Sequence, residues 1–261
     1  MPEIFGQYTV PGLDGERLVR VHVPSSAPAP SRSPGPVSRR RGVAPRPLLV
    51  LFDGQNVFDD EPSFSGGWYV HTAVERLRPT GYNVPIIVAI DHGGEQRIDE
   101  LGPFRAGGRG GKADVLLEWL GATLLPEVRG RYSIVEGPVG VCIGGSSMGG
   151  LASLYAHFRR PDLFGGVIAM SPSFWFGQRA LFSFVAKQEN PAFSRIYLDG
   201  GLQEGSGNMA SLVARMAEHL TGRGYGPEKL KLVLDPKGGH GERHWRRRFP
   251  AALRFMYRKP M

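Results

Sequence analysis

Continuous runs of apolar residues recur along most of this chain and alternate with longer segments of mixed character. Apolar runs of strand length are typical of central parallel strands, because such strands are covered on both faces of their sheet. The strands predicted in this way are residues 48–52, 86–90, 139–143, 167–170, 196–198 and 230–234.

The segments between these runs carry apolar residues three or four positions apart, which is the period of an amphipathic helix. In residues 112–128, for example, Leu116, Leu117, Leu120 and Leu124 share one stripe. The full set of predicted helices is 71–78, 112–128, 151–159, 180–187, 211–220 and 243–257. Alternating strands and helices predict an α/β fold with a mostly parallel sheet and helices on both of its faces.

The first part of the chain has a different pattern. Residues 8–10 and 17–23 alternate apolar and polar positions around a turn rich in glycine and aspartate, which predicts an antiparallel β-hairpin. Residues 25–46 follow, rich in proline, serine and arginine, and predict a flexible insertion. Because the piece before it is too small to fold alone, we expect residues 1–261 to form a single domain.

Residues 145–149 carry the most specific chemical signal, the pattern G-x-S-x-G with Ser147 at its centre. A predicted strand precedes the pattern and a predicted helix follows it, as in a nucleophile elbow. The glycines allow neighbouring elements to approach closely, and the helix N-terminus offers free N–H groups beneath the serine. The sequence therefore predicts Ser147 as the nucleophile of an acyl-transfer enzyme.

A serine nucleophile requires a base and an acid, which follow it in the order acid, then histidine, in hydrolases of this kind. His240 lies just after the last predicted strand and is our candidate base, with His244 as its rival. Glu204 and Asp199 both follow residues 196–198, and we favour Glu204 because its glycine-rich loop could reach the histidine. Asp235 is less suitable, since it lies on the last strand itself.

The negative charge that develops on a carbonyl oxygen also requires hydrogen-bond donors. We expect one donor to be the backbone N–H of Met148, directly after the nucleophile. The loop Asp53-Gly54-Gln55 follows the first long buried strand, and Gly54 would permit a sharp turn there. The backbone N–H of Gln55 is therefore the second predicted donor.

Together these segments resemble the esterase family of α/β-hydrolases, which includes enterochelin-esterase-like enzymes, feruloyl esterases, S-formylglutathione hydrolases and mycolyltransferases. The resemblance extends from about residue 47 to the end of the chain and rests on residues 51–59, 89–100, 145–150 and 239–245. It implies an α/β-hydrolase fold without a large cap domain. It also implies Ser147, His240 and Glu204 as the catalytic triad, with the Gln55 and Met148 amides as the oxyanion hole.

The same resemblance makes Trp245 a packing aromatic residue rather than a catalytic group. Two features depart from the family pattern: the insertion at residues 25–46, and Gly241 at a position that is often polar. The segment that holds Arg97, Asp99 and Glu100 could border the substrate pocket or form structural ion pairs.

The net charge of +8 raises the question of a nucleic-acid partner. No nucleic-acid-binding motif accompanies the arginines, so we interpret residues 246–248 and the nearby basic residues as solvated surface charge. The single cysteine, Cys142, lies in an apolar run and predicts a buried thiol and no internal disulfide. With no signal peptide or membrane span in the sequence, we expect a cytoplasmic protein of undetermined oligomeric state.

These features predict a serine carboxylester hydrolase that acts on a small-molecule ester through an acyl-enzyme and needs neither metal nor cofactor. An acyltransferase with an alcohol or sugar as acceptor would use the same groups. A third interpretation, a non-catalytic module that binds anions, would require an incomplete triad.

Overall fold

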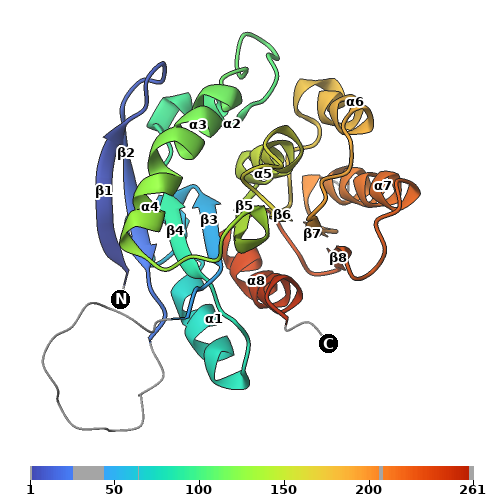
Figure 1. Cartoon of the computed structure of the whole chain (residues 1–261). Helices are drawn as coiled ribbons and strands as arrows, with labels where there is room; N and C mark the ends of the chain where they lie inside the picture. The colour runs from blue at the N-terminus through green and yellow to red at the C-terminus, as the bar shows by residue number, and fades with distance from the viewer. Residues whose placement is uncertain (1, 26–43, 64, 206–207, 259–261) are drawn as a thin grey trace, which may run out of the picture.

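A computed structural model describes residues 2–25, 44–63, 65–205 and 208–258. One eight-stranded sheet, in the order β1-β2-β4-β3-β5-β6-β7-β8, runs through the molecule (Figure 1). Only the pairs β1–β2 and β2–β4 are antiparallel. The strands are β1 (Glu3–Thr9), β2 (Glu16–His22), β3 (Leu48–Phe52), β4 (Ile86–Ile90), β5 (Val141–Ser146), β6 (Gly166–Met170), β7 (Arg195–Gly201) and β8 (Leu230–Asp235).

Helices cover both faces of this sheet. Their bounds are α1 (Val70–Leu77), α2 (Arg97–Leu101), α3 (Ala113–Trp119), α4 (Leu125–Arg131), α5 (Met148–Arg159), α6 (Ala180–Lys187), α7 (Asn208–Gly222) and α8 (Glu242–Met256). Helices α1 and α8 pack side by side on one face, and the other six helices lie across the opposite face (Figure 1).

The alternation of side chains along each central strand supplies both layers of the core. In β3, Leu48, Val50 and Phe52 face the layer that contains α3 to α7. Leu49 and Leu51 face the layer that contains α1 and α8. Since all five residues are buried, the continuous apolar run is explained by burial on both faces.

The predicted fold class is confirmed, and the predicted bounds of β3, β4 and α6 agree with the structure. The hairpin is also present, although β1 begins earlier than expected, at Glu3. No cap domain interrupts the sheet within the described parts of the chain. Of the predicted insertion at residues 25–46, residues 26–43 lie outside the described residues.

Most other predicted elements are present with bounds that differ by a few residues, and two differ in kind or position. The strand expected at residues 139–143 instead spans Val141–Ser146, because Pro138–Gly140 forms a 3₁₀ turn. The helix expected at residues 112–128 contains a π-helical turn, Leu120–Leu124, between α3 and α4. Pro126 lies just after that turn and has no N–H to give to the carbonyl of Ala122, which explains the local change in hydrogen bonding.

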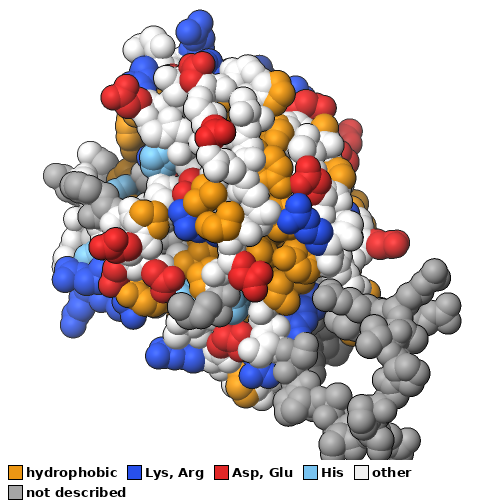
Figure 2. Space-filling view, turned by 90° about the vertical axis from the view of Figure 1, so that its left-hand side faces the viewer, with side chains coloured by type: hydrophobic (Ala, Val, Ile, Leu, Met, Phe, Trp, Pro, Cys, Tyr) orange, Lys and Arg blue, Asp and Glu red, His pale blue; other side chains and the backbone are white. Residues whose placement is uncertain are grey.

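The surface and the interior agree with most of the expectations from composition. Acidic and basic side chains are interspersed on the face at the β1 edge of the sheet (Figure 2). Cys142 is buried, and burial raises the pKa of its thiol. None of the helices in the described ranges has the length and apolar character needed to cross a bilayer.

Candidate active site

Ser147 occupies the sharp turn between β5 and α5. Its backbone has φ 54° and ψ −119°, a strained conformation for a residue with a side chain. The turn is held by a hydrogen bond from the Ser147 N–H to the Met170 carbonyl at 2.9 Å. A Cβ on Gly145 would lie 2.8 Å from the backbone of Gly149, so the close approach requires glycine, as predicted.

The structure brings Ser147, His240 and Glu204 together from three separate parts of the chain. The Nε2 of His240 lies 3.0 Å from Ser147 Oγ, and its Nδ1 lies 3.0 Å from Glu204 Oε2. An ionised carboxylate can only accept, so Nδ1 carries the proton and Nε2 is free to accept one from the serine. The three side chains thus form a hydrogen-bonded chain of serine, histidine and carboxylate, in the order that was predicted from the sequence.

Glu204 is buried, which by itself would raise its pKa. The hydrogen bond from His240 and a second from Ser171 Oγ outweigh this effect, and together they hold the pKa of Glu204 below its ordinary value. Its Oε1 also accepts from the Gly201 N–H at 2.8 Å. Glu204 is therefore ionised at neutral pH.

The other carboxylates considered from the sequence take different partners. Asp199 lies 3.1 Å from Arg248 Nη2, and its Oδ1 accepts from the Ser171 N–H at 3.2 Å. Burial raises its pKa to about 6. Asp235 pairs with Arg247 at the surface. Of the three carboxylates, only Glu204 contacts the histidine in the structure.

Arg248 and Ser171 were missed in the sequence, and the interpretation of residues 246–248 as solvated charge is wrong for Arg248. Its side chain is 3% exposed and contacts both Asp199 and Glu204. A sequence signal existed, because Arg248 falls on the buried stripe of α8 that holds Trp245 and Phe249.

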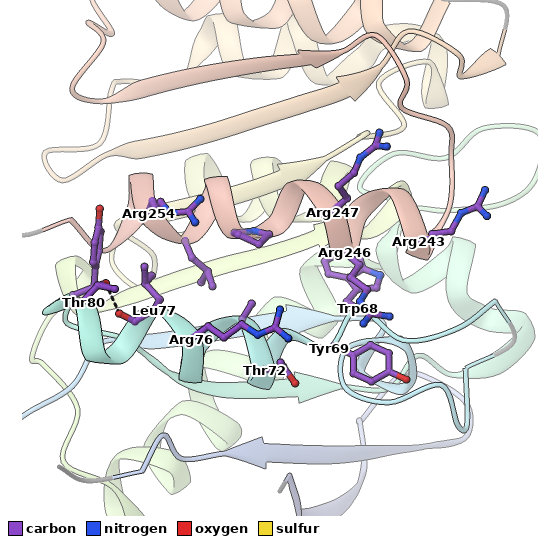
Figure 3. A pocket seen from close by; sticks show the side chains of 14 residues that line it. Trp68, Tyr69, Thr72, Arg76, Leu77, Thr80, Arg243, Arg246, Arg247 and Arg254 are labelled. Carbon is purple, nitrogen blue, oxygen red and sulfur yellow. Dashed lines mark hydrogen bonds between the residues drawn. The ribbon is translucent and has the colours of Figure 1, made fainter. Parts of the chain in front are cut away.

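Other arginines of α8 remain at the surface. Arg243, Arg246 and Arg254 line a groove of about 730 Å³ between α8 and α1, with Arg76 on the α1 side (Figure 3). The Arg246 guanidinium lies over the ring of Tyr69, 3.9 Å from its centroid. Arg248 thus differs from its neighbours in both exposure and partners.

Trp245 and His244 complete the surroundings of the histidine. Trp245 is buried, meets the His240 ring edge to face at 5.0 Å, and donates from Nε1 to Ser171 Oγ. It therefore packs against the site, as the resemblance implies. His244 lies against Gly239 and takes no part in the contact with Ser147.

A turn follows β3 at the predicted residues, but the prediction that Gly54 provides its unusual backbone conformation is wrong. The left-handed residue is Asp53, with φ 58°, and not Gly54. Glycine is required at 54 because a Cβ would lie 2.7 Å from the backbone of β4. Gln55 is the second residue of the 3₁₀ turn Gly54–Asn56, and Met148 is the first residue of α5, so both lie where N–H groups lack acceptors in their own helix.

The Arg97, Asp99 and Glu100 side chains form structural contacts. Arg97 makes two hydrogen bonds of 2.7 Å to Asp53, the residue that holds the left-handed turn. Glu100 is buried in an ion pair with Arg17. Asp99 accepts from the Gly110 N–H at 2.6 Å. Ion pairing, the alternative named from the sequence, accounts for these residues.

Ser173 contacts Ser147 directly, because its Oγ lies 3.2 Å from Ser147 Oγ and its N–H donates to the Ser147 carbonyl. A cavity of about 590 Å³ begins two residues further along the chain, at Trp175. Trp175 lines the cavity and is 56% exposed. Arg179 and Arg215 lie on the same lining.

Comparison with known proteins assigns the chain to a family. Residues 16–256 match the family model "Esterase", described as "Putative esterase". The chain belongs to this esterase family. It is therefore a carboxylic ester hydrolase with the α/β-hydrolase fold.

Individual relatives agree with this assignment. The chain is 22% identical to the uncharacterized protein YbbA of Bacillus subtilis, over 82% of this chain and 86% of that protein. It is 28% identical to the iron(III) enterobactin esterase of Escherichia coli, over 77% of this chain and 47% of that enzyme. The chain thus spans about half the length of that enterobactin esterase.

Among solved structures, the BES protein from Bacillus cereus superposes with a TM-score of 0.76 at 20% identity, over 99% of this chain and 95% of that one. The enterochelin esterase from Shigella flexneri gives 0.75, also at 20% identity, over 98% and 58%. At these identities the similarity shows a common fold.

The contacts of the two buried carboxylates predict different effects of removing their charges. Glu204→Gln should lower kcat by about 10²- to 10⁴-fold, because the amide cannot stabilise the imidazolium as the carboxylate does. Asp199→Asn should retain kcat within about tenfold at pH 8, since it keeps an acceptor oxygen and does not contact His240. Steady-state kinetics of both variants test this, and a larger loss in Asp199→Asn would contradict it.

Proposed function

We propose that this esterase is a serine hydrolase that forms an acyl-enzyme on Ser147. The observation that carries the proposal is the chain of two 3.0 Å contacts from Ser147 to His240 and on to Glu204. Ser147 Oγ attacks the ester carbonyl and transfers its proton to His240 Nε2. The imidazolium returns this proton to the departing alcohol, and water then repeats the sequence to release the acid.

The proposed oxyanion hole consists of the backbone N–H groups of Met148 and Gln55. The start of α5 at Met148 supports the first donor, because this N–H has no partner within the helix and lies next to the nucleophile. The fixed turn at Asp53, held by Arg97, supports the second. Donors held rigidly before the reaction stabilise the tetrahedral intermediate without reorganisation.

For the substrate, we propose an ester whose acyl part carries an aromatic or anionic group. The cavity lined by Trp175 supports this, since Trp175 offers an exposed ring two residues after Ser173, and Arg179 and Arg215 offer positive charge. Esters of siderophores have this chemistry, and two curated relatives are iron(III) enterobactin esterases. A siderophore ester is therefore the first natural substrate class to assay.

The serine mechanism is tested with p-nitrophenyl esters of graded chain length and a fluorophosphonate probe. The wild-type protein should turn over the esters and become labelled, whereas Ser147→Ala should lose at least about 10³-fold in kcat and all labelling. Ser146→Ala is the matched control and should retain activity. Turnover that persists in Ser147→Ala would contradict the proposal. Added alcohol that captures most of the acyl group would instead indicate an acyltransferase.

The proposed acyl pocket predicts a selective effect on KM. Trp175→Ala and Arg179→Gln should raise KM about tenfold for an ester with an aromatic, carboxylate-bearing acyl group, because stacking and charge pairing are lost. The KM for p-nitrophenyl acetate should stay unchanged, since acetate is too small to reach the cavity. Equal effects on both substrates would place the acyl group elsewhere.

A further inference from the structure

Two carboxylates and one guanidinium are buried together behind His240. The Nη2 of Arg248 lies 3.1 Å from Asp199 Oδ1 and 3.4 Å from Glu204 Oε1. None of these three side chains is more than 3% exposed. Isolated buried charges are costly, so each member of this cluster depends on the others.

Ser171 connects the members of the cluster and fixes the direction of one hydrogen bond. Its Oγ lies 2.6 Å from Arg248 Nη2, 3.0 Å from Trp245 Nε1 and 2.7 Å from Glu204 Oε1. The guanidinium and the indole can only donate. The Ser171 hydroxyl must therefore give its own proton to Glu204, which orients the carboxylate toward His240.

The charges of the cluster sum to −1 when Asp199 and Glu204 are ionised and Arg248 is protonated. When His240 takes the serine proton, the sum over the four groups becomes zero. The single negative charge that the cluster keeps stabilises the imidazolium as it forms, while the charge of the serine passes to the oxyanion. Without Arg248 the same sum would be −1 in the transition state and −2 before it.

We propose that Arg248 and Asp199 are positioning residues that set the net charge behind His240, while Arg248 and Ser171 hold Glu204 against its Nδ1–H. This inference rests on the proposed serine mechanism and adds to it. Neither residue touches the reacting atoms. Arg248 acts through its contact with Glu204, and Asp199 acts through its charge and its contact with Arg248.

Other titratable groups face this cluster, and none of them is substituted in the test below. Asp235 lies 3.9 Å from Arg248 Nη1 and is paired with Arg247. Tyr197 faces Asp199, and burial together with that carboxylate raises the pKa of its hydroxyl. Glu242 faces His240, with Arg97 and Asp53 nearby.

The test is the dependence of kcat/KM on pH, measured with p-nitrophenyl butyrate. The acid limb of this profile is the range in which kcat/KM falls as His240 becomes protonated. Asp199→Asn removes one negative charge and makes that protonation less favourable, so the limb should move to lower pH by about half to one unit. Arg248→Met removes the positive charge and leaves a sum of −2. A proton then binds more readily to the imidazole and the two carboxyls, so the limb should move to higher pH. It should also lower kcat more than it changes KM.

The double variant Arg248→Met with Asp199→Asn restores the net charge of −1. Its acid limb should return toward the wild-type position, and it should recover part of the kcat lost in Arg248→Met. Arg246→Met is the matched control, because Arg246 lies on the same helix, is exposed and contacts Tyr69 rather than this cluster. This control should leave the profile unchanged.

Acid limbs that do not move in Asp199→Asn, or a double variant less active than Arg248→Met, would overturn the charge-balance inference. If Arg248→Met does not fold, the downward shift in Asp199→Asn still decides the question. Ser147→Ala is assayed in parallel. Activity in that variant would overturn the serine mechanism itself, whereas unmoved profiles with Ser147-dependent activity would overturn only the role of Arg248 and Asp199.

Discussion

The turn at Ser147 is the constraint on which the rest of the site depends. Its φ of 54° is unfavourable for serine, and the surrounding packing must hold it. The Ser147 N–H is fixed to β6, and the close approach of Gly145 and Gly149 leaves no room for a side chain. Because β5 is central in a sheet with a core layer on each face, the strained turn follows a strand that is buried along its whole length.

A second constraint is the buried carboxylate on the Nδ1 side of His240. Glu204 is buried and ionised, and four donors surround its carboxylate: His240, Ser171, Arg248 and the Gly201 N–H. The sheet makes this possible, since Ser171 follows β6 and Glu204 follows β7, and these strands are parallel neighbours. The carboxyl ends of parallel strands thus gather the groups that the chemistry requires.

Much of this could be predicted from sequence because the signals are local. The run from Leu48 to Phe52 indicates a strand buried on both faces, and G-x-S-x-G between a strand and a helix indicates the elbow. Chain order suggested His240, and chain order together with the glycine-rich loop suggested Glu204. Contacts between distant residues could not be predicted in this way: Ser171 and Arg248 are 77 residues apart, and only the folded sheet and α8 bring them together. The turn at Asp53 was attributed to Gly54 because glycine usually supplies a positive φ, whereas here it supplies room for β4.

The most direct measurement is the mass of the protein during turnover. The enzyme is mixed with p-nitrophenyl butyrate, quenched in acid within milliseconds to seconds, digested and analysed by mass spectrometry. The account predicts a butyryl group on Ser147 in the wild-type protein, and no such group in Ser147→Ala. Ester turnover with the acyl group on another residue, or with no butyryl group on Ser147 at any quench time within the first turnovers, would contradict it.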